Sequence, residues 1–306
     1  MDRERLISVN NLTKKYKFGT AVANVTFDIQ RKHIYGLVGP NGAGKTTIMK
    51  MLGGLVIPSG GQIHFYDGER ELSPEQARRQ MSFMIETPYL RRDRTARQNL
   101  EKLRLLKNVA NPQVIDDVLE IVGLSDVPKN KTVRKYSLGM RQRLGIANAL
   151  MSHPQCMVLD EPINGLDPTG IVEIRELLQR LNRQDGVTIL ISSHILSELA
   201  NLCTDYIFLH HGRIINSISG EELAKVCGSN LLINTEQNQL AQQLLSDQLG
   251  IAVLKREDGQ LRIPDAVDCK KEILNVLVNN GVTLLHMSEE TQDLETYYMS
   301  LIQDAD

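Results

Sequence analysis

Residues 39–47 combine glycines, a lysine and hydroxyl side chains at a spacing that suits a bound phosphate. They read Gly39-Pro40-Asn41-Gly42-Ala43-Gly44-Lys45-Thr46-Thr47. Glycines allow the backbone to turn so that successive N–H groups face one anion. The lysine brings positive charge to the outer phosphates, and the hydroxyl after it can ligate Mg²⁺. A structural glycine turn would not account for Lys45 and Thr46, so we predict that this segment binds a nucleotide.

A second group of polar side chains follows the apolar run 156–159. Asp160 and Glu161 come directly after this run, ahead of Pro162. At the carboxyl end of a parallel strand, Asp160 can reach a Mg²⁺ ion held by Thr46, and Glu161 can polarise the attacking water. By itself the segment could equally be a solvated turn after a core strand. Together with the phosphate loop it predicts a site that hydrolyses ATP.

These residues require a strand before the loop and a helix after it. Residues 34–38 are a short apolar run typical of a buried parallel strand, and the N-terminus of a predicted helix at 46–52 favours phosphate. Further strands are predicted at 6–9, 22–29, 63–66, 81–85, 156–159, 187–192 and 206–210, and helices at 168–181 and 195–202. Residues 95–107, 112–122 and 138–151 are helix-like. The order predicts an α/β P-loop core with an inserted helical subdomain at about residues 87–152.

The pattern changes near residue 228. Residues 227–230 have the composition of a linker, after which strands and helices alternate again. Strands are predicted at 231–234, 252–254, 261–263 and 282–286, and helices at 238–249, 270–279 and 292–302. The order β-α-β-β-α-β predicts a small α+β domain of ferredoxin-like type. We therefore predict an ATPase domain at 1–227 and an accessory domain at 228–306.

Composition excludes several classes of protein. The net charge is −2, with 5 Phe, 8 Tyr and no Trp in 306 residues, so we expect no nucleic-acid partner. The four cysteines form no C-x-x-C pair, which is typical of reduced cytoplasmic thiols. The charged start, residues 1–5, predicts no secretory signal, and no apolar run is long enough to cross a bilayer. We expect a cytoplasmic protein whose membrane part, if it has one, is another chain.

Residues 6 to about 225 resemble the ATPase subunits of ATP-binding cassette (ABC) transporters, motif by motif and in the same order. Ser137-Leu138-Gly139-Met140-Arg141-Gln142 lies where that family has its signature loop. The resemblance implies that Ser137 and Gly139 bind the γ-phosphate of ATP held by an opposing subunit, in a head-to-tail homodimer. It also implies that Asp167, in 164–167, joins the two ATP sites. His194 would contact the γ-phosphate, and Tyr16 would stack on adenine, with Phe18 as the alternative ring.

The sequence departs from the common family pattern at two places. The signature loop has Tyr136, Leu138 and Met140 in place of the usual residues. Glu86 stands after the strand 81–85, where the family usually has a glutamine that touches Mg²⁺ and the attacking water. A carboxylate adds negative charge beside Asp160 unless the metal screens it. Both departures resemble the branch that exports peptide antibiotics, which includes bacitracin-resistance and lantibiotic self-immunity ATPases.

The sequence therefore predicts the ATP-binding and ATP-hydrolysing subunit of an ABC transporter that powers export of an antimicrobial peptide or other amphipathic compound. The predicted site residues fall into three groups: the catalytic residues Glu161, His194 and Glu86; the Mg²⁺ ligands Thr46, Asp160 and Glu86; and the ATP contacts Tyr16, Gly39, Asn41, Gly42, Gly44, Lys45, Thr46, Thr47, Ser137, Gly139 and Asp167.

We expect the protein to lie peripherally on the cytoplasmic face of the cell membrane and to bind integral membrane permease subunits through residues around 86–107. The basic side chains there could also be no more than a solvated face. The alternative function is a soluble ABC ATPase that acts on ribosomes or nucleic acid. Soluble ABC ATPases that resemble translation factors carry two cassettes in one chain, and those that act in DNA repair carry long coiled-coil insertions. This chain has one cassette and no extended heptads.

Overall fold

The computed structural model describes residues 5–256, 259–264 and 266–305, so the charged residues 1–4 lie outside it. The chain divides into two compact units, residues 1–220 and 221–306. This division falls at the start of helix α8 (Gly220–Val226), ahead of the predicted boundary at residue 228. The linker predicted at 227–230 is wrong for its last three residues. They begin strand β11 (Gly228–Thr235), because their backbone pairs with strand β14 (Leu284–Gln292).

The first unit is built on a six-stranded sheet of order β10-β9-β3-β8-β7-β6. Its strands are β3 (Ile34–Val38), β6 (Met81–Met84), β7 (Cys156–Asp160), β8 (Thr188–Ser193), β9 (Asp205–His210) and β10 (Arg213–Ser219). All neighbours are parallel except β10, which is antiparallel to β9 at the edge. Every residue of β3, β7 and β8 is buried, which explains their nearly continuous apolar runs.

A second, antiparallel sheet of order β2-β1-β4-β5 belongs to the same unit. Its strands are β1 (Arg5–Tyr16), β2 (Gly19–Gln30), β4 (Gly60–Asp67) and β5 (Arg70–Leu72). Alternate residues of β2, such as Val25, Phe27 and Ile29, are buried, as its sequence pattern predicts. They join one apolar core with Ile48 and Met49 of the helix after the phosphate loop. Burial of each such side chain contributes about 1.5–3 kcal/mol, so this core fixes the base of the loop.

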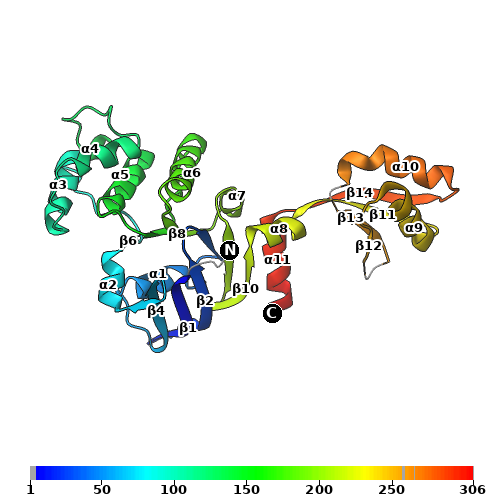
Figure 1. Ribbon diagram of the computed structural model, residues 1–306, viewed down its shortest axis with the longest axis horizontal. Helices are drawn as coiled ribbons and strands as arrows, with labels where there is room; N and C mark the ends of the chain where they lie inside the picture. Colours follow the sequence, from blue (N-terminus) through cyan, green and yellow to red (C-terminus); the bar gives the residue numbers. More distant parts are fainter. Residues whose placement is uncertain (1–4, 257–258, 265, 306) are drawn as a thin grey trace. The chain divides into compact units, whose positions relative to one another are not determined.

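Three helices of the first unit form the predicted helical subdomain, which lies beyond the β6 edge of the six-stranded sheet (Figure 1). They are α3 (Ala96–Leu106), α4 (Val114–Ile121) and α5 (Leu138–Leu150). The remaining helices of this unit are α1 (Lys45–Leu52), α2 (Pro74–Arg79), α6 (Pro168–Arg183) and α7 (Leu196–Ala200), and a 3₁₀ turn spans Val133–Lys135. Thr95 begins α3 with a capping box, since its hydroxyl accepts from Gln98 N while Gln98 bonds back to Thr95 N.

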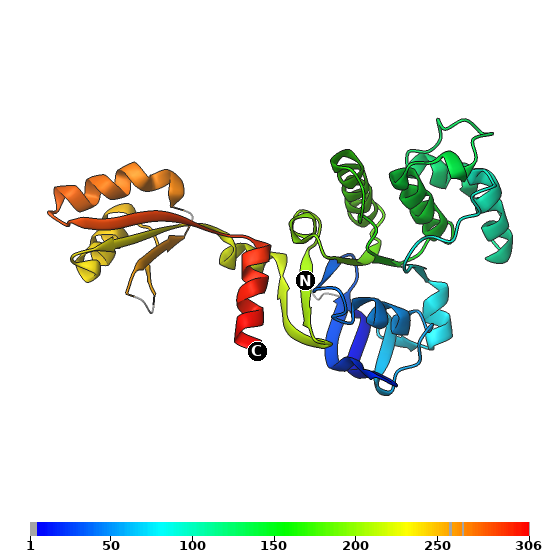
Figure 2. The ribbon, with the colours of Figure 1, turned by 180° about the vertical axis from the view of Figure 1, so that it is seen from behind.

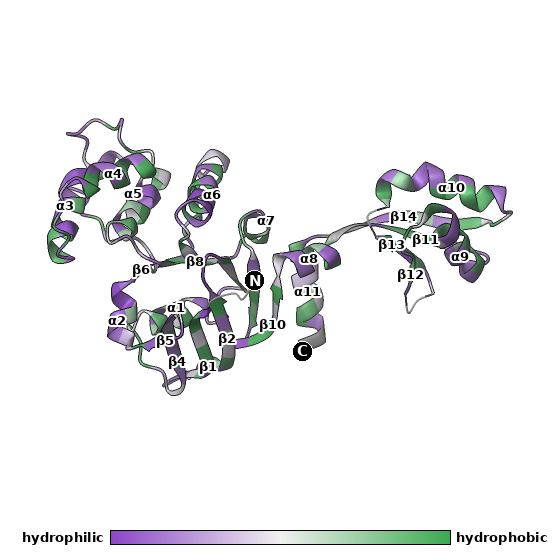
Figure 3. Cartoon of the chain, viewed as in Figure 1, coloured by the Kyte–Doolittle hydropathy of each residue, from purple (hydrophilic) through white to green (hydrophobic). Residues whose placement is uncertain are grey.

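The second unit contains an antiparallel sheet of order β12-β13-β11-β14 (Figure 2). Its other elements are β12 (Leu254–Lys255), β13 (Leu261–Pro264), α9 (Asn238–Leu249), α10 (Lys270–Asn279), α11 (Leu294–Ala305) and a 3₁₀ turn at Val267–Cys269. Leu231, Ile233, Leu245 and Leu277 share a core separate from that of the first unit. Helix α10 accordingly carries both hydrophobic and hydrophilic residues (Figure 3).

The structure adds two strands and one helix that the sequence pattern did not predict, namely β5, β10 and α2, and also the two 3₁₀ turns. In the described part of the chain, no helix has the length and hydropathy needed to cross a membrane.

Candidate functional site

The phosphate loop runs from the end of β3 into α1, as predicted. Gly44 has φ 104° and precedes the first helical residue, Lys45. A Cβ at Gly44 would lie 2.6 Å from the carbonyl oxygen of Ala21, and one at Gly39 would lie 2.6 Å from that of Leu209. Neither position can accept a side chain unless the backbone moves, because both neighbours are main-chain atoms. Asn41 and Gly42 are exposed at the tip of the loop, so a ligand can approach there.

Lys45 is buried and turns back over the loop. Its ammonium group donates to the carbonyl oxygens of Gly39 at 2.6 Å and Pro40 at 3.1 Å. Burial lowers the pKa of Lys45, and the nearby carboxylates of Glu161 and Asp160 oppose this by raising it. The structure therefore places a partly desolvated cation beside the loop, where it would bind phosphate oxygens strongly.

Thr46 and Asp160 meet at the carboxyl end of the parallel sheet. The Thr46 hydroxyl donates to Asp160 Oδ2 at 2.9 Å, and the Ser192 hydroxyl donates to Asp160 Oδ1 at 2.6 Å. Asp160 and Ser192 are both buried and are paired in the register of β7 and β8. Hydroxyl and carboxylate oxygens are the hard donors that Mg²⁺ prefers. A Mg²⁺ ion would fit here with Thr46 and Asp160 as protein ligands.

Glu161 is held in place from both ends. Its backbone has φ 50°, and its N–H donates to the Ser192 carbonyl at 3.2 Å and to the Ser192 hydroxyl at 3.0 Å. Its carboxylate Oε2 lies 2.7 Å from His194 Nδ1. A left-handed backbone at a non-glycine residue costs about 1–3 kcal/mol and is typical of functional sites. The structure thus brings the predicted residues Glu161 and His194 together, next to Asp160.

Glu86 is paired with Lys50 rather than with Thr46 or Asp160. Its carboxylate accepts a hydrogen bond of 2.6 Å from the ammonium group of Lys50, and its backbone has φ 63°. Lys50 follows Thr46 by four residues on α1, so the two side chains share one face and are about one helical turn, or about 5.4 Å, apart. The hydrogen bond that Lys50 donates to Glu86 raises the pKa of Lys50. The extra negative charge of Glu86 is therefore compensated by Lys50.

Tyr16 lies at the end of β1, and its ring is 49% exposed with the Lys14 ammonium 5.1 Å from its centroid. Phe18, in the following turn, is 93% exposed. Ala21 and Val22, on the next strand, contact the loop at Gly44. The hairpin that carries both rings thus borders the phosphate loop. Stacking of Tyr16 on adenine stays a prediction.

Ser137 and Gly139 begin helix α5 in the helical subdomain. The Ser137 hydroxyl accepts from Met140 N at 3.2 Å, which makes Ser137 the predicted N-cap. Asp167 likewise caps α6 by accepting from Gly170 N at 3.3 Å. Among the described residues, no hydrogen bond joins Ser137, Gly139 or Asp167 to the phosphate loop of the same chain. The structure therefore leaves these three residues outside the group formed by Lys45, Thr46, Asp160, Glu161 and His194.

Two residues of the site were missed by the sequence analysis. Ser192 bonds to both acidic residues, and Lys50 neutralises Glu86. A signal for Ser192 existed, because Ser192-Ser193 closes an otherwise apolar buried strand beside the strand of Asp160. The sequence contained no signal for Lys50, because a lysine on a helix is ordinarily solvated and its partner, Glu86, lies 36 residues away.

Comparison with known proteins places this geometry in a family. Residues 22–164 match the family model described as ABC transporter. The bacitracin transport ATP-binding protein BcrA of Enterococcus faecalis is 35% identical over 99% of this chain and 98% of its own length. The lantibiotic transport ATP-binding protein SrtF of Streptococcus pyogenes is 42% identical over 69% of this chain and 89% of its own. The ATP-binding cassette MJ0796, in a dimeric post-hydrolysis state bound to ADP and Pi, matches with a TM-score of 0.62 and 25% identity. That match covers 70% of this chain and 99% of MJ0796.

Proposed function

This chain belongs to the ABC transporter family as an ATP-binding protein that hydrolyses ATP, and on this premise we propose that it powers export of an antimicrobial peptide through separate membrane subunits. The observation that carries the proposal is similarity to BcrA over nearly the whole of both chains, the C-terminal unit included. Glu86 supports the proposal, since glutamate in place of the usual glutamine resembles the sequences of the peptide-antibiotic branch.

The site residues have separate roles in this proposal. Lys45 and the loop amides at Gly39, Asn41, Gly42, Gly44 and Thr47 bind the phosphates. Thr46 and Asp160 hold Mg²⁺, which when bound screens negative charge on the phosphate oxygens. Glu161 orients the attacking water or accepts its proton, while His194 fixes the Glu161 carboxylate and contacts the γ-phosphate. Tyr16 stacks on adenine.

The chain would act as a head-to-tail homodimer. ABC cassettes form dimers, as the MJ0796 structure illustrates. Ser137 and Gly139 cap a helix without reaching their own chain's phosphate loop, which supports their use by an opposing subunit. Asp167, at the start of α6, would link the two ATP sites. ATP binding would then close two sites at once.

Permease subunits would dock between the core and the helical subdomain. A cavity of about 330 Å³ lies there, lined by Leu55, Phe83, Tyr89, Leu103, Lys107 and Gly145. Tyr89 is 86% exposed and Leu55 is 68% exposed. Large exposed apolar side chains beside a cavity are typical of a protein interface. Tyr89, Leu103 and Lys107 bring part of the predicted contact region 86–107 to this cavity, and docking there would hold the protein at the cytoplasmic face of a membrane.

The test is purification of the chain in detergent from its native membranes, followed by antibiotic susceptibility of a strain that lacks its gene. We expect an integral membrane protein to co-purify and the deletion strain to become more sensitive to a peptide antibiotic. The wild-type gene should restore resistance, and a gene carrying Lys45→Ala should not. Recovery of ribosomes or nucleic acid in place of a membrane protein would favour the soluble alternative. Unchanged susceptibility would refute the proposal that the transported compound is an antimicrobial peptide.

Glu86 is expected to act in coupling. Glu86→Gln should retain basal ATPase activity within about threefold, because the side chain is bonded to Lys50 and the amide can still accept that hydrogen bond. Transport by the complete complex should fall. Lys50→Gln is the matched control, since it breaks the same pair from the other side. A transport defect in Glu86→Gln alone assigns the contact to the carboxylate itself. Equal transport by Glu86→Gln and wild type would refute the role.

The C-terminal unit is proposed to be a ferredoxin-like domain. Its sheet order β12-β13-β11-β14 and its antiparallel pairing are those expected of a β-α-β-β-α-β chain of this type. It occupies the accessory part at residues 228–306 that the sequence analysis separated from the ATPase domain at 1–227. Helix α8, which precedes residue 228, belongs almost entirely to the same compact unit.

A further inference from the structure

The helical subdomain has a clear excess of basic over acidic residues, unlike the chain as a whole. Residues 87–152 contain 13 Lys and Arg against 6 Asp and Glu, although the whole chain has a net charge of −2. The phosphate loop, Asp160, Glu161 and His194 lie on other elements, and the roles proposed for Ser137 and Gly139 use no basic side chain, so this charge is not used by the chemistry described above. A charge excess confined to one block indicates an anionic partner for that block.

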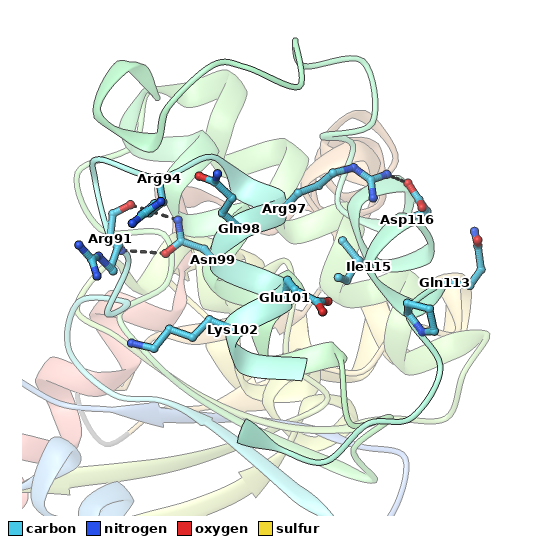
Figure 4. Close-up of a pocket in the computed structure, with 11 residues that line it drawn as sticks. Arg91, Arg94, Arg97, Gln98, Asn99, Glu101, Lys102, Gln113, Ile115 and Asp116 are labelled. Atoms are coloured by element: carbon cyan, nitrogen blue, oxygen red, sulfur yellow. Dashed lines mark hydrogen bonds and ion pairs between the residues drawn. The ribbon is translucent and has the colours of Figure 1, made fainter. Parts of the chain in front are cut away.

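A groove between α3 and α4 concentrates part of this charge (Figure 4). It has a volume of about 830 Å³, and its basic lining residues are Arg91, Arg94, Arg97 and Lys102. A smaller neighbouring cavity of about 100 Å³ shares the Arg97–Asp116 ion pair and adds Lys129 and Lys131. The two cavities therefore form one basic track across the subdomain.

The acidic residues of the groove are already paired. Glu101 accepts two hydrogen bonds of 2.8 Å from Arg104, and Asp116 is paired with Arg97. Asp93 is shared by Arg91 at 3.1 Å and Arg94 at 3.6 Å, so one positive charge remains in excess. Lys102 is exposed and has no ion pair among the described residues. The groove thus has a surplus of about two positive charges for a ligand.

The loop that carries Arg91 and Arg94 is fixed. The buried Asn99 amide accepts from Arg91 N at 2.8 Å and donates to the Arg91 carbonyl at 3.1 Å, as Figure 4 shows. Val133 N donates to the Arg94 carbonyl at 2.8 Å. The two guanidinium groups are therefore presented from an ordered backbone, which lowers the entropic cost of binding.

Exposed leucines lie on the same helix. Leu105 is 64% exposed and Leu106 is 71% exposed, three and four residues after Lys102, so all three share one face of α3. A basic face joined to exposed apolar side chains is typical of helices that lie on a membrane surface. A protein segment with a few carboxylates would not need charge spread over the whole subdomain, whereas a layer of headgroups would.

We propose that the groove between α3 and α4 binds the phosphate of anionic phospholipid headgroups and rests the helical subdomain on the membrane. This inference rests on the proposed function, because a permease-bound subunit is held beside a bilayer. It adds a direct contact with lipid that is independent of the permease. Each Lys or Arg near an anionic surface contributes about 1 kcal/mol, which corresponds to about a fivefold change in affinity.

The experiment is co-sedimentation of the purified full chain with vesicles in the absence of permease. One vesicle is phosphatidylcholine, and the other mixes it equally with phosphatidylglycerol. We expect binding to the anionic vesicle only, weakened when salt rises from about 0.1 M to about 1 M. Arg94→Gln with Lys102→Gln should lower affinity about 25-fold. Lys255→Gln with Lys271→Gln removes the same charge from exposed sites of the second unit and should change it less than about twofold.

Asp93→Asn should instead raise affinity about fivefold, because it frees Arg91 and Arg94. Such a gain in affinity cannot result from unfolding. Thermal melting checks that the variant with Arg94→Gln and Lys102→Gln is folded.

Equal sedimentation with both vesicles, or equal effects of the groove and control variants, would overturn the proposal. Full competition by inorganic phosphate would make the groove a site for free phosphate. If the groove variants lose binding to the permease but still bind the vesicles, the ligand of the groove is an acidic protein segment. Failure to recover a permease would refute the proposed function and leave vesicle binding intact.

Discussion

Replacing Glu161 by glutamine is expected to lower ATP turnover by about 10²–10⁴-fold while leaving ATP binding close to wild type. Positioned acid–base groups contribute about this factor. The amide keeps the shape of the side chain and can still accept a hydrogen bond from His194, now 2.7 Å from Glu161 Oε2. It cannot accept the proton of the attacking water. Release of phosphate and equilibrium binding of a fluorescent ATP analogue measure the two effects separately.

The matched control is Glu176→Gln, the same substitution at an exposed position of α6. It should change neither quantity, since the side chain lies nine residues, or about two and a half turns, along α6 from Asp167. Wild-type turnover by the Glu161→Gln variant would show that another group handles the proton. A parallel loss of ATP binding would show that Glu161 acts in ground-state binding rather than in chemistry.

Lys45→Ala is expected to weaken ATP binding roughly 10- to 100-fold. Hydrogen bonds to charged groups contribute about 1.5–3 kcal/mol, and the Lys45 ammonium is partly desolvated, so its loss should reach this range. The measurement is the Kd for ATP with Mg²⁺, before any turnover. Lys50→Ala, one turn further along α1, is the control, because its ammonium bonds Glu86 and not the loop. An equal loss in both variants would assign the effect to the charge of α1 as a whole.

The pH dependence of ATP binding gives an independent check on Lys45. Burial lowers the Lys45 pKa in the free protein, and bound phosphate favours the protonated form. Affinity is therefore highest below the free-protein pKa and falls as pH rises through it, at a lower pH than an ordinary lysine would produce. Lys45→Ala should lose this alkaline dependence. A wild-type affinity that stays constant up to the ordinary lysine range would contradict the role of Lys45.

Much of the fold was predictable because its signals are local. The phosphate loop, its strand and its helix occupy residues 34–52 without interruption, so spacing alone defined them. The ABC resemblance and the ATPase activity are confirmed by the comparisons, as is the P-loop α/β core. The roles of single site residues stay predictions. Short or exposed elements were missed because β5 has three residues and half-exposed β10 lacks a periodic apolar face.

The sequence by itself determined that a phosphate loop and an acidic strand end exist, since each is a contiguous run of residue types with one chemical use. The tertiary structure decided how they combine. The parallel register of β7 and β8 brings Ser192 within hydrogen-bond distance of Asp160 and of Glu161 N. The fold also brings Glu86, two residues after β6, to Lys50 of α1. It also decided that residues 228–230 form a strand, through pairing with β14. Such contacts join residues tens of positions apart, and backbone register between strands is set by packing of the whole sheet, which no local pattern records.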